Sequence, residues 1–151
     1  LKKAIHEETG LNPEYANYDG TPQYNSDHYH FYSDAYRTAL NIAVDTEWYG
    51  GDPVLLQRLE KLQTFFAVIA KGKENVIYTI DGESTGEEIL HPVGLLATNA
   101  AASLAIKDRP YARYFVEQFW ETPLRKGERR YYDNFLYAFA FLALSGNYRM
   151  Y

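Results

Sequence analysis

The chain has 151 residues, of which 46% are hydrophobic and 23% charged, a balance typical of a globular domain rather than a disordered segment. A net charge of −5 without a basic stretch argues against a nucleic-acid partner. Cysteine is absent, which excludes disulfides and thiolate metal sites. No apolar run approaches the roughly 20 residues that span a membrane. We expect a soluble protein and leave its compartment open between the cytoplasm, the periplasm and the exterior.

The unusual feature of the composition is its 15 tyrosines, with aromatic residues at 17% overall. Such bulky rings can simply fill a helical core. They can also line a groove in which sugar rings stack against flat apolar faces with polar rims. Composition alone leaves both interpretations open.

Periodicity and capping residues predict a mostly helical chain. Residues 12–29 form a long loop, of the kind that often carries function in a compact domain. Asp52 and Pro53 cap and start a helix. A β-rich run at 76–80, followed by Asp81-Gly82, predicts a small hairpin or extended excursion. The expected helices cover residues 1–8, 34–49, 53–70, 92–106, 110–120 and 131–144.

Two kinds of helix alternate in this order. The second, fourth and sixth helices are apolar almost all round, which requires burial on all sides, whereas the other three carry a charged face. Three hairpins of one inner and one outer helix make an arc of an (α/α) toroid, and about six pairs close one. The predicted fold is therefore all-α, half of an (α/α)6 barrel with a small β excursion near 76–82. A plain six-helix bundle fits the same pattern.

On the first inner helix, Asp34 and Arg37 begin a polar stripe that continues through Asn41 and Asp45. Asp34 can be a simple first-turn acid favoured by the helix dipole and paired with Arg37. It can also be a general base, because a carboxylate beside an arginine stays ionised and can take a proton from water.

The loops before the three inner helices should open on one face, around a central cleft. His91 stands before the second inner helix, and Tyr131, Tyr132 and Asp133 stand at the start of the third. Each also has a plain explanation, as a capping segment with a solvated histidine or as a first-turn acid. These residues are therefore candidates for lining the cleft.

Other chemistries have little support in the sequence. His28 and His30 lie on one side of an extended loop but lack a clear third ligand, so no metal site is expected. The chain has no serine in a strand–turn–helix elbow. It has no phosphate loop or dinucleotide fingerprint, so no cofactor is expected.

Several motifs occur in order between about residue 10 and the end of the chain. They are Tyr32-Ser33-Asp34-Ala35-Tyr36-Arg37, Asp45-Thr46-Glu47-Trp48-Tyr49-Gly50-Gly51, His91-Pro92-Val93-Gly94-Leu95-Leu96-Ala97-Thr98-Asn99-Ala100 and Arg130-Tyr131-Tyr132-Asp133-Asn134. Together they resemble glycoside hydrolase family 8. Tyr18-Asp19-Gly20-Thr21-Pro22 and the Leu90-His91-Pro92 kink resemble, more narrowly, the reducing-end-xylose-releasing exo-oligoxylanases of that family.

The resemblance implies an (α/α)6 barrel, an inverting mechanism and β-1,4-xylo-oligosaccharide substrates. It implies that Asp34 is the general base and that Arg37, Tyr131 and Tyr132 support it. Endo-acting xylanases or glucanases of the same family are the alternative, as is a helical carbohydrate-binding module without catalysis.

The resemblance also implies that Leu90, His91 and Pro92 close the cleft beyond the first leaving-group subsite, with His91 on the reducing-end sugar. Tyr18 is expected to bind substrate as well. The family's general acid is a glutamate in the N-terminal half of the barrel, and no glutamate here matches its motif. Residues 1–151 are therefore expected to be the C-terminal half of one catalytic domain, with the N-terminal half as its partner.

Overall fold

The computed structural model describes residues 1–148, and this part of the chain is mostly helical, with five α-helices and one two-stranded sheet. A 3-10 turn (Ser33–Tyr36) leads into the first α-helix, and a π-helical turn (Phe65–Ile69) extends the second. The α-helices are α1 (Arg37–Tyr49), α2 (Pro53–Thr64), α3 (Pro92–Ala102), α4 (Ala112–Glu121) and α5 (Arg130–Leu144). The sheet pairs β1 (Val76–Tyr78) with β2 (Ser84–Glu88).

Local sequence explains where α2 begins. The Asp52 carboxylate accepts the backbone N–H of Val54 at 3.0 Å and that of Leu55 at 3.3 Å, and Pro53 occupies the first helical position. These contacts satisfy two of the N–H groups that every helix start leaves free. The predicted cap is therefore confirmed.

Helix α3 is the centre of the domain. It packs against α1 on one side and α5 on the other, and it also contacts α2 and α4. Ala97, Ala100, Ala101 and Ala102 are fully buried on it, because methyl side chains let neighbouring helices approach closely. The prediction that this helix is buried all round is confirmed.

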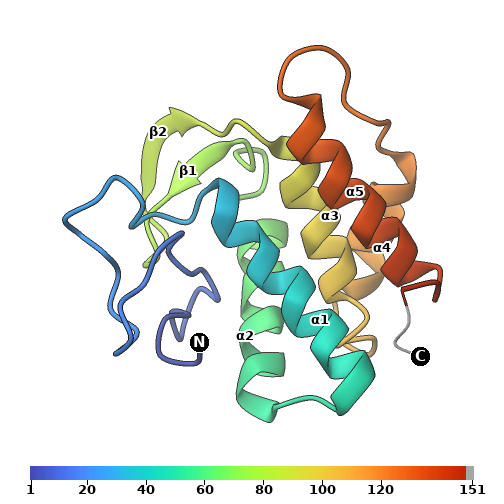
Figure 1. Ribbon diagram of the computed structural model, residues 1–151, viewed down its shortest axis with the longest axis horizontal. Helices are drawn as coiled ribbons and strands as arrows, with labels where there is room; N and C mark the ends of the chain where they lie inside the picture. The colour runs from blue at the N-terminus through green and yellow to red at the C-terminus, as the bar shows by residue number, and fades with distance from the viewer. Residues whose placement is uncertain (149–151) are drawn as a thin grey trace.

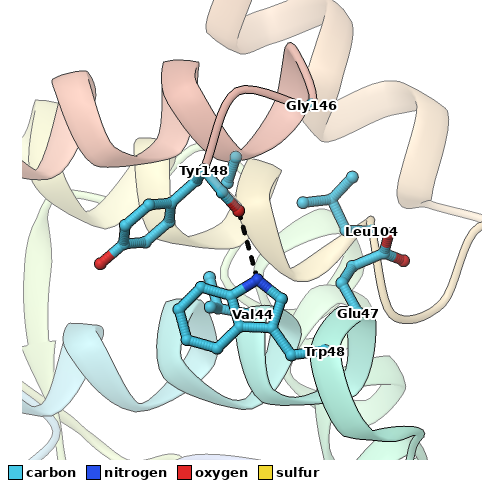
Figure 2. A pocket seen from close by; sticks show the side chains of 7 residues that line it. Val44, Glu47, Trp48, Leu104, Gly146 and Tyr148 are labelled. Atoms are coloured by element: carbon cyan, nitrogen blue, oxygen red, sulfur yellow. Dashed lines mark hydrogen bonds between the residues drawn. The ribbon is translucent and has the colours of Figure 1, made fainter. Parts of the chain in front are cut away.

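The helices α1, α3 and α5 form a row whose N-terminal ends lie toward the top of the view in Figure 1. At the other end of the row, the Trp48 indole N–H donates to the Tyr148 backbone carbonyl at 3.2 Å, across a hollow of about 450 Å³ that Leu104 also lines (Figure 2). The two tryptophans, Trp48 and Trp120, lie near the ends of α1 and α4, and both are partly exposed.

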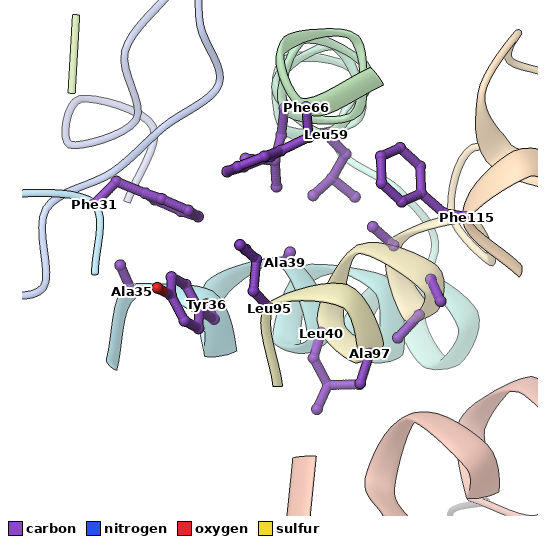
Figure 3. Packing of buried hydrophobic residues seen from close by; sticks show 14 of the residues in the cluster. Phe31, Ala35, Tyr36, Ala39, Leu40, Leu59, Phe66, Leu95, Ala97 and Phe115 are labelled. Carbon is purple, nitrogen blue, oxygen red and sulfur yellow. The ribbon is translucent and has the colours of Figure 1, made fainter. Parts of the chain in front are cut away.

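Part of the hydrophobic core lies between α2 and the pair α1 and α3, and Leu40 and Ala97 lie on the opposite side of this pair, toward α5 (Figure 3). Tyr36 and Leu95 face Leu59 and Phe66 across it, and Phe31 closes one edge. The Phe31 ring lies 5.2 Å from that of Tyr36 and 5.7 Å from that of Phe66, measured between centroids. Phenylalanines therefore supply most of the buried rings, and among the described tyrosines Tyr36 and Tyr78 are the buried ones. Core filling accounts for only part of the aromatic composition.

The predicted hairpin is present, but its second strand lies beyond the expected range of 76–82. The structure pairs Ser84–Glu88 antiparallel to β1, and every residue of that strand is exposed. A strand without apolar residues gives no alternating pattern to detect. The hairpin is joined to the start of α1 through the Phe31 N–H, which donates to the Tyr78 carbonyl at 2.9 Å.

The expected helix at 1–8 is wrong, and with it the first of the three expected inner–outer hairpins. Residues 1–9 form turns. Distant contacts fix them: Thr9 Oγ1 donates to the Ile80 carbonyl at 2.6 Å, and Arg58 Nη1 donates to the Glu7 carbonyl at 2.9 Å. Such contacts across 71 and 51 residues leave no local periodicity in the sequence.

The prediction that the first and third inner helices are buried on all sides is not met within the described residues, because α1 and α5 both expose side chains. On α5, Tyr131, Phe135 and Phe139 follow one another at intervals of four, each at least 36% exposed. Adjacent rings of this series are 4.6 and 6.0 Å apart between centroids. We refer to Tyr131, Phe135 and Phe139 as the α5 aromatic stripe.

Candidate active site

Asp34 lies in the 3-10 turn that precedes α1, rather than in the first turn of an α-helix as expected. Its carboxylate oxygen Oδ2 is 2.8 Å from Arg37 Nη2, so the predicted ion pair is present. The Asp34 side chain is 34% exposed, which leaves the carboxylate accessible to water. Before it, Ser33 has φ = 31°, on the left-handed side that non-glycine residues rarely adopt. The chain therefore enters α1 through a strained residue directly before the carboxylate.

Tyr132, at the start of α5, reaches this turn across 98 residues of sequence. Its hydroxyl donates to the Ser33 carbonyl at 2.8 Å and lies 3.4 Å from Asp34 Oδ1. Burial raises the pKa of this hydroxyl to about 12, with Arg37 acting in the opposite direction. Tyr132 is therefore a neutral hydrogen-bond donor at physiological pH.

His91, immediately before α3, completes the group. Its ring lies 4.4 Å from the Tyr132 ring between centroids, and it is largely buried. The starts of α1, α3 and α5 are thus joined through Asp34, Tyr132 and His91. The expectation that these helix entrances converge on one face agrees with this geometry.

Asp133 holds the His91 segment in place from α5. Its side chain is fully buried and accepts the Gly94 backbone N–H at 2.6 Å. The Arg125 guanidinium forms an ion pair with it and also donates to the Leu90 carbonyl. His91 Nδ1 is 3.4 Å from the same carboxylate. The 90–94 turn, Pro92 included, is therefore bound to α5 by one buried carboxylate and its arginine.

Glu14 is a site residue that the sequence did not indicate. Its carboxylate is only 4% exposed, accepts the Asp34 N–H at 3.0 Å through Oε1, and lies 2.6 Å from His28 Nδ1 through Oε2. A single glutamate in a loop without periodicity carries no sign of burial. Its role becomes visible only in the folded structure, where the loop packs against Asp34.

Below this group, a groove of about 370 Å³ runs between α1 and α5. Arg37, Asn41 and Asp45 line one side, and Leu136 and Phe139 the other. The polar stripe predicted on the first inner helix therefore faces a groove with an apolar opposite wall.

Two predicted site residues lie apart from this group. Tyr131 is 76% exposed, and its ring contact is with Phe135. Tyr18 is fully exposed and lines a hollow of about 640 Å³ together with Leu1, Lys3 and Leu55. Among residues 1–148, no described contact joins either of them to Asp34.

The described residues contain no cluster of three or more histidine, aspartate or glutamate side chains that could hold a metal ion. His28 is paired with Glu14, and the His30 ring is 4.1 Å from Tyr29 between centroids. Within the same part of the chain, no helix combines the length and hydrophobicity needed to cross a membrane.

Fold and site together define a helical domain with a water-accessible carboxylate, a phenol and an imidazole at the converging starts of three helices. No family model matches the chain. It is 58% identical to the reducing-end xylose-releasing exo-oligoxylanase Rex8A of Paenibacillus barcinonensis, over all of this chain and 40% of that relative. It is 55% identical to a reducing-end xylose-releasing exo-oligoxylanase of Halalkalibacterium halodurans, over 99% of this chain and 38% of that relative.

Solved structures agree with these similarities. The chain matches a reducing-end-xylose releasing exo-oligoxylanase mutant crystallised with xylobiose, with a TM-score of 0.94 and 55% identity, over 98% of this chain and 39% of that one. Endoglucanase C of Ruminiclostridium cellulolyticum is more distant, at 27% identity over 97% of this chain. The resemblance indicated by the motifs is confirmed: the chain is homologous to a segment of the exo-oligoxylanase group of glycoside hydrolase family 8. It spans about two fifths of the length of these relatives.

Proposed function

We propose that this chain is the C-terminal half of one (α/α)6 barrel catalytic domain, in an inverting glycoside hydrolase that releases xylose from the reducing end of β-1,4-xylo-oligosaccharides. The observation that carries the proposal is the grouping of Asp34, Tyr132 and His91 at converging helix starts, in a chain 55–58% identical to exo-oligoxylanases. The N-terminal half of the barrel is its partner in the proposal.

The proposed role of Asp34 is the general base. Inverting hydrolysis needs one carboxylate that takes a proton from the attacking water and one carboxylic acid that protonates the leaving oxygen, with the two groups about 6.5–9.5 Å apart. Asp34 is suited to the first role because it is accessible to water and its Oδ2 is paired with Arg37 at 2.8 Å. The proposed acid is a glutamate of the N-terminal half.

The neighbouring residues have supporting roles in this proposal. Tyr132, a neutral donor held between Asp34 and His91, orients the base. His91, with Leu90 and Pro92, forms the turn at which the reducing-end sugar stops. The fixed position of this turn, held through Asp133, suits such a barrier.

In the proposal, Tyr131 supports the general base and Tyr18 binds substrate in the complete domain. Both are highly exposed, and so both are available to a partner segment or to sugar. The exposed α5 aromatic stripe supports the half-barrel proposal for the same reason, since a large apolar face on a helix is normally covered.

The experiment is an Asp34→Asn substitution in the full-length enzyme, assayed on xylotriose. Loss of the base should lower kcat by several orders of magnitude while xylotriose still binds. The anomeric form of the products, followed by NMR, should show inversion. Near-normal activity in the variant would exclude Asp34 as the base.

An endo-acting xylanase or glucanase is the second candidate, favoured by the 27% identity to endoglucanase C. Product analysis separates the two activities. Xylose released from the reducing end supports the exo-acting enzyme, and mixed internal fragments support the endo-acting one. A non-catalytic binding module would bind the sugars and release nothing.

A further inference from the structure

The peptide bond between Ser33 and Asp34 is held at both of its polar ends. Its carbonyl accepts a hydrogen bond from Tyr132 Oη at 2.8 Å, and its N–H donates to Glu14 Oε1 at 3.0 Å. A peptide unit is planar, so fixing its carbonyl and its N–H fixes the orientation of the whole plane. The direction in which the Asp34 side chain leaves the backbone is thereby determined from two sides.

Burying the Glu14 carboxylate beside this peptide costs free energy. A carboxylate that is 4% exposed loses its hydration and must be compensated by hydrogen bonds or charge. Both of its oxygens are used: one for the Asp34 N–H and the other for His28 Nδ1 at 2.6 Å. His28, 47% exposed, therefore holds the second oxygen of Glu14 and fixes the direction of the first.

The strained backbone explains why a clamp is needed. Ser33 has φ = 31°, and Tyr32, the residue that caps this turn, makes no side-chain capping bond. Non-glycine residues keep such a conformation only when the surroundings enforce it. The Glu14 and Tyr132 bonds act on the peptide that follows Ser33, and so they stabilise this entry to α1.

We propose that Glu14 is a positioning residue for the general base: with Tyr132 it clamps the Ser33–Asp34 peptide, and His28 keeps its carboxylate aligned. This inference rests on the proposed role of Asp34. Glu14 contacts the backbone of the base rather than substrate, so its effect falls on the orientation of the Asp34 carboxylate and hence on kcat.

The test uses the full-length enzyme on xylotriose, with kcat and KM measured separately. Glu14→Ala should lower kcat by about tenfold to a hundredfold, the loss expected for a catalytic group misplaced by roughly 1 Å, while KM changes less than about threefold. Glu14→Gln should recover most of the loss, because its amide oxygen can still accept the Asp34 N–H. Glu8→Ala, on an 80% exposed glutamate, is the matched control and should behave as wild type.

His28 gives a second route if Glu14→Ala does not fold, since its half-exposed side chain tolerates substitution. His28→Ala should lower kcat several-fold at unchanged KM, and His28→Asn, whose amide nitrogen can replace Nδ1, should restore it. Wild-type kcat in both Glu14→Ala and His28→Ala would overturn the proposal, as would equal losses in Glu14→Ala and Glu14→Gln.

Asp34→Asn, measured in parallel, separates the two levels of the proposal. If Asp34→Asn is inactive and the Glu14 variants are fully active, Asp34 remains the base and the clamp is wrong. If Asp34→Asn is active, the base assignment itself fails, and the clamp with it.

Discussion

Asp133 on α5 caps α3, although the two helices belong to separate parts of the chain. Its carboxylate accepts the Gly94 N–H at 2.6 Å, and Gly94 occupies the third position of α3, where no preceding residue can accept. His91, the residue in the capping position of α3, makes no side-chain capping bond. Glu14 does the same for Asp34 in the turn before α1. Two helix starts at the candidate site are thus satisfied by carboxylates from other elements.

The first prediction concerns Asp133 itself. Asp133→Ala leaves the Gly94 N–H without an acceptor and the Arg125 guanidinium without its buried partner. Removing one member of a buried ion pair costs about 3–5 kcal/mol, and we expect the lower end because Arg125 is 25% exposed. The free energy of unfolding of the full-length enzyme, measured in urea, checks this. Asp108→Ala, at an exposed site, should change it by less than about 0.5 kcal/mol.

The second prediction concerns the absence of a side chain at Gly94. A Cβ there would lie 2.9 Å from Leu136 Cδ1 and 3.2 Å from Asp133 Oδ1. Gly94→Ala should therefore destabilise the protein by about 1 kcal/mol, because overpacking costs about 1–3 kcal/mol and the gain in helix propensity offsets up to about 1. Thermal unfolding measures the effect.

Leu136→Val tests the cause of that effect. Shortening the side chain relieves the contact, so the Gly94→Ala/Leu136→Val double variant should be less destabilised than the sum of the two single variants. Strict additivity would place the cause elsewhere.

The sequence predicts the elements that depend on local pattern. The capping residue Asp52 and the first helical residue Pro53 predict the exact residue at which α2 begins. The alanines of α3 indicate that this helix is buried. The sequence also predicts the contact between Asp34 and Arg37, because residues three positions apart in a helical turn lie on the same face. These features depend on residues within one or two turns of each other.

The sequence does not predict what depends on distant contacts. The turns at 1–9 are fixed by Ile80 and Arg58, and the burial of Glu14 depends on how a loop folds over a turn 20 residues away. The role of Asp133 was open for the same reason, since a first-turn acid can be either a solvated residue or a buried acceptor. In both cases the buried side chain is a single acid whose partner lies 20 or more residues away, and no local pattern indicates such a contact.

The third prediction concerns Tyr132 and pH. Burial raises the pKa of its hydroxyl from 10.0 to about 12 in the folded protein. A group whose folded-state pKa lies above its unfolded value contributes its full stability below the unfolded pKa and loses it as the pH rises through the folded one. The stability difference between wild type and Tyr132→Phe should therefore be constant from pH 7 to 9. Between pH 10 and 12 it should shift in favour of the variant.

Urea unfolding across this pH range measures the difference. A difference that stays constant from pH 7 through pH 12 would contradict the effect of burial on this hydroxyl.

The fourth prediction concerns the α5 aromatic stripe. In the half-barrel proposal this face is covered by the N-terminal half, so the isolated 151-residue chain should self-associate through it. Phe135→Ser/Phe139→Ser should reduce light scattering by the isolated chain. In the full-length enzyme the same pair should lower the free energy of unfolding by several kcal/mol, because the half-barrel proposal buries the two rings there. Val54→Ser, on an exposed valine of α2, should do neither. If the full-length enzyme tolerates the double variant without loss, this face of α5 is not an internal surface of the complete domain, and the half-barrel arrangement would have to be replaced by one that leaves the stripe in solvent.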